Sequence, residues 1–92
     1  MADGNRSETW KRDVGGRLRA VRTAAGFATA HGFAKELGVE ENTLTSWERG
    51  LRLIEPEDLD GVRRLTGVTS DYIYYGDSAG LPAVMIERLK PG

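Results

Sequence analysis

Residues 29–50 of the chain read TAHGFAKELGVEENTLTSWERG. The first part opens on a threonine, a good N-cap, has apolar residues at helical spacing, and stops at Gly38. The second part carries mostly polar residues and stops at Gly50. The pattern therefore predicts two short helices, over residues 30–37 and from about residue 40 or 41 to residue 49, joined by a tight turn.

The second of these helices has two different faces. At about 100° per residue, Leu44 and Trp47 fall on one face, which we assign to the core. Short polar side chains occupy the opposite face: Asn42, Thr45, Ser46 and Arg49, with Glu41 at its edge. A row of exposed hydrogen-bonding side chains suits the major groove of DNA, although an ordinary solvated surface can have the same pattern.

The rest of the chain predicts four more helices, and nothing reads as a strand. One begins near residue 13 and ends at Gly26, and two adjacent glycines weaken its first turn by about 1 kcal/mol each relative to alanine. Its apolar stripe consists of Val14, Leu18, Val21 and Ala25. The other three helices run from Pro56 to near Gly67, over residues 71–75, and from about Pro82 to Leu89.

Length and composition predict one globular domain. The chain has 92 residues, of which 39% are hydrophobic and 29% charged. We expect a helix-turn-helix domain at residues 13–77, preceded by an N-terminal extension at residues 1–12. Residues 78–92 form a C-terminal segment that is a possible dimer contact.

Several function classes lack the residues that they need. The chain has no cysteine and a single histidine, His31, so neither a disulfide nor a metal site is expected. There is no Ser-His-Asp set and no phosphate-cradling glycine loop, so we expect no enzyme and no cofactor. No apolar run approaches the roughly 20 residues of a membrane span, and the first residues, MADGNRSE, contain no apolar signal. The expectation is a cytoplasmic protein.

Charge is distributed unevenly along the chain. Residues 1–35 carry a net charge of +4, residues 36–62 a net charge of −6, and residues 63–92 a net charge of +1. The predicted polar helix thus lies in the acidic segment. Contacts with phosphate would have to come from selected residues rather than from a general positive field.

Three separated motifs agree with a known family. These are GRLRAVRTAAGF at 16–27, FAKELGVEENTLTSWERG at 33–50, and LTGVTSDYIYYGD at 65–77. In this order and spacing they resemble the lambda-repressor/Cro-type bacterial helix-turn-helix transcriptional regulators. The resemblance implies an all-α fold, a five-helix lambda-repressor-like DNA-binding domain, here with a short extra C-terminal helix. It also implies a sequence-specific regulator of bacterial or phage type, acting as a repressor and reading the major groove of double-stranded DNA.

The resemblance also suggests individual roles. The positions that correspond to base contacts are Glu41, Asn42, Thr45 and Ser46. The positions at or near the DNA backbone are Thr29, Thr43 and Arg49, and Arg52 is a further candidate that could instead be a solvated charge, as could Arg63 and Arg64. In the family, a pair at the positions of Arg22 and Glu48 links the first helix to the third, and we interpret it as structural.

Other assignments stay open. Trp10 either packs back onto the core or the C-terminal segment, or contacts a partner. His31 is either a surface residue or a neighbour of a phosphate. The apolar tail LPAVMIERL, with the helix before it, suggests a homodimer. The alternative to DNA binding is a helix-turn-helix fold used as a protein-interaction module, such as an antitoxin or an adaptor, which the acidic middle of the chain favours.

Overall fold

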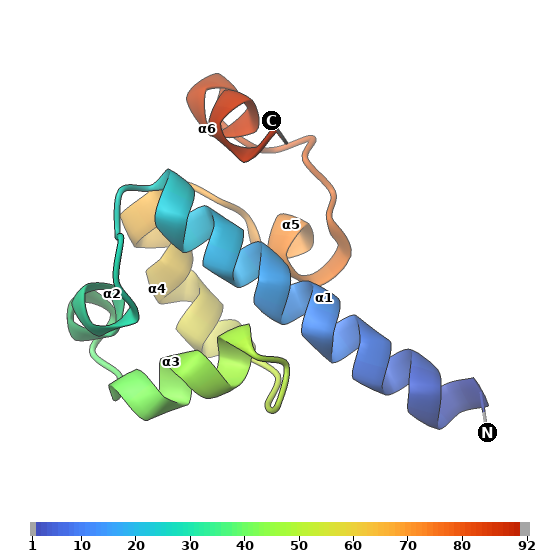
Figure 1. Ribbon diagram of the computed structural model, residues 1–92. Helices are drawn as coiled ribbons and strands as arrows, with labels where there is room; N and C mark the ends of the chain where they lie inside the picture. Colours follow the sequence, from blue (N-terminus) through green and yellow to red (C-terminus); the bar gives the residue numbers. More distant parts are fainter. Residues whose placement is uncertain (1, 91–92) are drawn as a thin grey trace.

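A computed structural model describes residues 2–90, with side chains from residue 7 onward, as an arrangement of six helices (Figure 1). No strand occurs in these residues, so the all-α prediction is confirmed. The helices are α1 (Ala2–Ala24), α2 (Ala30–Leu37), α3 (Glu41–Glu48), α4 (Pro56–Thr66), α5 (Ser70–Tyr75) and α6 (Ala83–Leu89). Within the described part of the chain, no helix is long and apolar enough to cross a membrane.

Helix α1 runs through the middle of the fold. It contacts α3, α5 and α6, while α2 packs on α3 and α4. In Figure 1 the first turns of α1 extend beyond the other helices, and α6 lies at the opposite side of the molecule from α3. The core contains fourteen buried apolar residues: Val14, Leu18, Val21, Phe33, Ala34, Leu44, Trp47, Ile54, Leu59, Val62, Val68, Ile73, Leu81 and Met85.

The predicted start of α1 near residue 13 is wrong, because the helix is continuous from Ala2. Gly15 and Gly16 do not interrupt it. A Cβ at Gly15 would overlap the carbonyl oxygen of Trp47 and would lie 2.6 Å from that of Glu48, whereas a Cβ at Gly16 would meet nothing within 4 Å. Gly15 therefore permits the close crossing of α1 over the end of α3, and its presence does not signal a helix end.

The N-terminal part of α1 is attached to α5. The indole nitrogen of Trp10 donates a hydrogen bond to the carbonyl oxygen of Tyr74 at 2.6 Å, and its ring stacks on Tyr75 with centroids 6.0 Å apart. Arg17 donates to the carbonyl oxygens of Ile73 and Tyr74, both at 2.9 Å. The first interpretation of Trp10 is confirmed in its core form, because the partly buried ring packs against the core. These donors satisfy carbonyls at the end of α5 that the helix itself leaves unpaired.

The apolar side chains of the later helices are only partly covered. Leu65, which its spacing places on the buried face of α4, is 36% exposed. In α6, Met85 is buried together with the preceding Leu81, whereas Val84 is 53% and Ile86 37% exposed. The C-terminal segment thus contributes to the core of its own domain and still presents apolar side chains to solvent.

Candidate nucleic-acid interface

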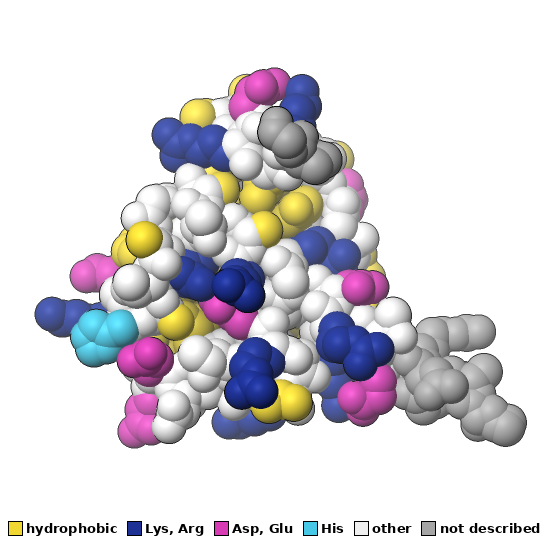
Figure 2. Space-filling model, in the orientation of Figure 1, with side chains coloured by type: hydrophobic (Ala, Val, Ile, Leu, Met, Phe, Trp, Pro, Cys, Tyr) yellow, Lys and Arg dark blue, Asp and Glu magenta, His cyan; other side chains and the backbone are white. Residues whose placement is uncertain are grey.

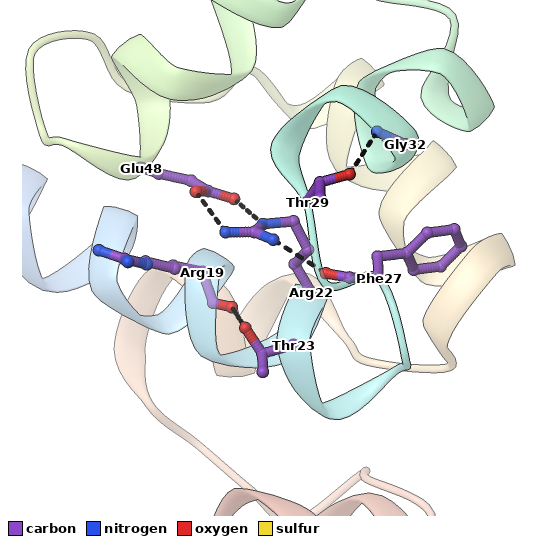
Figure 3. Close-up of polar contacts among 7 residues, drawn as sticks. All are labelled: Arg19, Arg22, Thr23, Phe27, Thr29, Gly32 and Glu48. Atoms are coloured by element: carbon purple, nitrogen blue, oxygen red, sulfur yellow. Dashed lines mark hydrogen bonds and ion pairs between the residues drawn. The ribbon is translucent and has the colours of Figure 1, made fainter.

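The turn between α2 and α3 is built as the sequence predicts. The Thr29 hydroxyl accepts a hydrogen bond from the backbone N–H of Gly32 at 3.1 Å, which caps α2 (Figure 3). Gly38 has a φ of 78°, in the left-handed region that favours glycine. Its neighbour Val39 donates a backbone hydrogen bond to Ala34 at 3.1 Å and closes the turn. The direction in which α3 leaves α2 is therefore fixed by backbone geometry.

Helix α3 turns its predicted apolar face inward. Leu44 and Trp47 are buried, and the short polar side chains lie toward solvent. Of these, Glu41 and Asn42 are exposed and Thr43, Thr45 and Ser46 are half-buried. The helix ends at Glu48, one residue earlier than predicted, so Arg49 is its C-cap and is exposed, as is Arg52.

Hydrogen bonds stabilise the two ends of the polar face. The hydroxyl of Thr45 donates to the carbonyl oxygen of Asn42 at 3.1 Å. The carbonyl oxygen of Ser46 accepts from the N–H groups of Leu51 and Arg52, at 2.9 and 3.3 Å. The Thr45 bond uses the donor of its hydroxyl and leaves the oxygen lone pairs for another partner. The Asn42 side-chain amide takes part in no hydrogen bond within residues 7–90.

A buried ion pair joins α3 to α1. The Nε of Arg22 donates to one carboxylate oxygen of Glu48 at 2.8 Å, and a second guanidinium nitrogen approaches the other oxygen at 3.3 Å. Both side chains are only 7% exposed. Arg22 also donates to the carbonyl oxygen of Phe27 at 2.8 Å, so it ties the α1–α2 connection to the same point (Figure 3). The proposed Arg22–Glu48 pair is present, and it fixes the angle at which α3 is held.

A second, exposed pair was not predictable from the sequence. The Nδ1 of His31 on α2 lies 3.4 Å from a carboxylate oxygen of Glu41 on α3. Both side chains are largely exposed, which agrees with the surface interpretation of His31. The two residues belong to different helices, so their contact depends on the turn angle and cannot be obtained from spacing alone.

A shallow hollow lies beside the polar face, where α1, α2 and α3 meet. It measures about 260 Å³ and is lined by Arg19, Arg22, Ala30, Thr45, Glu48 and Arg49. Because Arg22 and Glu48 neutralise each other, the hollow keeps the positive charge of Arg19 and Arg49. In Figure 3 the guanidinium of Arg19 points away from the buried pair. The sequence alone gives Arg19 no role, since its place beside α3 follows from the helix crossing.

Surface charge differs between the two ends of α3 (Figure 2). In that view several Lys and Arg side chains lie over α1 and the C-terminal end of α3, with acidic side chains among them, whereas the histidine lies by the start of α3 next to acidic and basic side chains. Among residues 7–90, no group of three or more metal-ligating side chains occurs.

Comparison with known proteins agrees with this geometry. A family model described as a helix-turn-helix domain matches residues 13–73, about two thirds of the chain. The matched region contains the α2–turn–α3 unit, the Arg22–Glu48 pair and α4. No curated protein and no solved structure matches the chain.

Proposed function

Because the chain belongs to the helix-turn-helix domain family, we propose that it is a sequence-specific DNA-binding protein that acts as a transcriptional repressor. In this proposal α3 enters the major groove of double-stranded DNA. The supporting observation is the solvent-facing polar side of α3, held at a fixed angle by the buried pair of Arg22 and Glu48. Such a helix can present the same donors and acceptors to every site, which sequence-specific readout requires.

The base-contacting residues in this proposal are Glu41, Asn42, Thr45 and Ser46. The Asn42 amide can form two hydrogen bonds with adenine, and a carboxylate at Glu41 can accept from the amino group of cytosine. At a DNA site that offers no such donor, the Glu41 carboxylate would only repel phosphate. Glu41 therefore contributes to specificity by disfavouring those sites. Thr45 and Ser46 can contact either a base or the backbone.

Backbone contacts are assigned to the residues around this face. Thr29 lies at the start of α2, where free N–H groups and the helix dipole favour an anion. Thr43 and the exposed arginines Arg49 and Arg52 flank the polar face at its side and C-terminal end. Arginine suits this role because its planar group offers several donors to a phosphate.

Selection from a random DNA pool tests the main proposal. We expect one enriched sequence motif, whose binding weakens steeply with salt. Asn42→Ala should lower the preference for the selected base by about 1–3 kcal/mol, whereas Arg49→Ala should weaken all sequences alike. If no sequence is enriched above background and binding to random DNA is absent, the DNA-binding proposal fails.

A homodimer is part of the proposal. Two-fold related recognition helices contact half-sites about 34 Å apart, and α6 leaves Val84 and Ile86 at its surface. Val84→Asp should give a monomer in sedimentation velocity and should leave the thermal unfolding of the domain nearly unchanged, because the residue is 53% exposed. A parent protein that sediments as a monomer at tens of micromolar contradicts this part.

The second candidate function is protein binding through the same fold, as in an antitoxin or adaptor. It is favoured by the acidic residues near the start of α3: Glu36, Glu40 and Glu41. This surface would attract a basic protein. In the random-pool experiment it predicts no enriched DNA sequence.

A further inference from the structure

Four arginines surround the place where α1 crosses the end of α3. Arg12 and Arg19 lie on α1, and Arg49 and Arg52 follow the last turn of α3. All four are exposed. Among residues 7–90, none of them lies within ion-pair distance of a carboxylate. The positive charge of this surface is therefore available to a ligand.

Packing places Arg12 directly on the connection that follows α3. Gly50 has a φ of 77°, and a Cβ added there would lie 2.8 Å from both the Cα and the Cγ of Arg12. Arg12 thus packs against Gly50, the residue that follows Arg49, although the two are far apart in sequence. The contact is made by the backbone N and Cα of Arg12 and by its Cγ, and the residue as a whole is exposed.

Arg19 extends the same surface toward α2. It lines the hollow together with Thr45 and Arg49, and this hollow opens beside the polar face of α3. Arg12 and Arg19 are two helical turns apart on one face of α1, about 10 Å along its axis. Two side chains this far apart on one face can contact different phosphates of the same DNA strand.

From this arrangement we propose that Arg12 and Arg19 join Arg49 and Arg52 in one phosphate-binding strip, along which the backbone of a DNA strand lies while α3 enters the adjacent groove. The inference rests on the proposed function and assigns α1 to it as an additional DNA-contacting element. Unpaired guanidinium groups in a row match a linear polyanion better than an apolar or basic partner. The strip also gives the domain a positive surface despite its net charge of −1.

Salt dependence of DNA binding tests the strip. The probe is a fluorescein-labelled duplex that carries the sequence selected by the parent protein, titrated by anisotropy at several KCl concentrations. Removal of one arginine–phosphate interaction should reduce the slope of log Kd against log salt by about 0.9. We expect the double variant Arg12→Gln/Arg19→Gln to reduce that slope by about 1.8 and to weaken selected and random duplexes by the same factor. Glutamine keeps the Cγ that packs against Gly50, and circular dichroism checks that the helices are retained.

A matched control has the same change in charge at a different place. Arg63 and Arg64 on α4 both pair with Asp60, at 3.2 and 3.3 Å. Arg63→Gln/Arg64→Gln should change the slope by clearly less than the α1 double variant. If the two double variants change it equally, the effect is one of net charge and the strip is overturned.

The outcomes separate the strip from the proposed function. If the parent binds its selected sequence and the α1 variant keeps the parent slope, only the strip is wrong. A variant that loses base preference but keeps its slope also contradicts the strip, because phosphate contacts carry no sequence information. If the parent binds no DNA, both proposals fail.

Discussion

Two adjacent glycines in α1 should respond in opposite directions to the same substitution. Gly16→Ala adds a methyl group with nothing within 4 Å. Because alanine is better than glycine inside a helix by about 1 kcal/mol, this change should raise the free energy of unfolding by about that amount. Gly15→Ala gains the same helix propensity but adds its methyl group against α3.

The cost at Gly15 follows from what the methyl group meets. Its nearest atoms are the carbonyl oxygens of Trp47 and Glu48 and the carbonyl carbon of Glu48, the last at 2.9 Å. All belong to the backbone, so no side-chain rotation can relieve the overlap and α1 must move away from α3. Overpacking of this kind costs about 1–3 kcal/mol, and a backbone obstacle favours the upper end of that range. After the gain in propensity, Gly15→Ala should lower the free energy of unfolding by about 2 kcal/mol.

The difference between the two variants is the decisive quantity. It should be about 3 kcal/mol, which corresponds to roughly 12–24 °C in Tm for a domain of this size. Urea and thermal unfolding, followed by circular dichroism, measure it with each variant as the control for the other. If Gly15→Ala is as stable as Gly16→Ala, the close crossing of α1 and α3 is not as described, and the physical reason given for the glycine is refuted.

Two further predictions concern polar groups that are buried or partly buried. Glu48→Ala leaves the guanidinium of Arg22 buried without its carboxylate, so it should lower the free energy of unfolding in urea by about 3–5 kcal/mol. The double variant Arg22→Met/Glu48→Leu should lower it by less than the sum of the two single changes. A decrease below about 1 kcal/mol in Glu48→Ala would contradict a buried pair. The Tyr74 hydroxyl donates to the carbonyl oxygen of Ile54 at 2.7 Å, and burial, together with the negative charge of Glu55, raises its pKa above the usual 10.0. The neutral form is therefore favoured by folding, and its contribution to stability is complete below about pH 10 and is lost as the pH rises through the raised pKa. Thermal unfolding at increasing alkaline pH should show a smaller decrease of Tm in Tyr74→Phe than in the parent, and an equal decrease would contradict this role.

Local structure was predictable because its causes are local. The cap at Thr29, the left-handed glycine at Gly38 and the division of α3 into a buried and a polar face all depend on residues within one or two turns. The Arg22–Glu48 pair was predictable only through the family resemblance, since its partners are on different helices. The individual DNA contacts remain predictions.

The features that the sequence does not predict depend on how distant segments meet. The sequence shows that Gly15 lowers helix propensity, which suggests a weak helix. It does not show that the backbone of α3 lies close to Gly15, which is why a glycine is needed there. The early start of α1 has a similar explanation: Trp10 and Arg17 bond to carbonyls at the end of α5, far away in the chain. The spacing on α4 assigns Leu65 to the core, yet no neighbouring helix covers it fully.

Charge counted along the chain gives a misleading picture of the surface beside α3. Residues 36–62 carry a net charge of −6, which suggests that the recognition helix lies in an electrostatic field unfavourable to DNA. In the fold, Glu48 is neutralised by Arg22, and Arg12 and Arg19 approach the C-terminal end of the helix from α1. At the start of α3, the carboxylate of Glu41 faces His31. Exposed arginines therefore lie at the C-terminal end of α3, whereas its start carries the carboxylate of Glu41. In the proposed DNA complex this arrangement favours a polyanion at the C-terminal end of α3, and it depends on arginines that belong to another segment of the sequence.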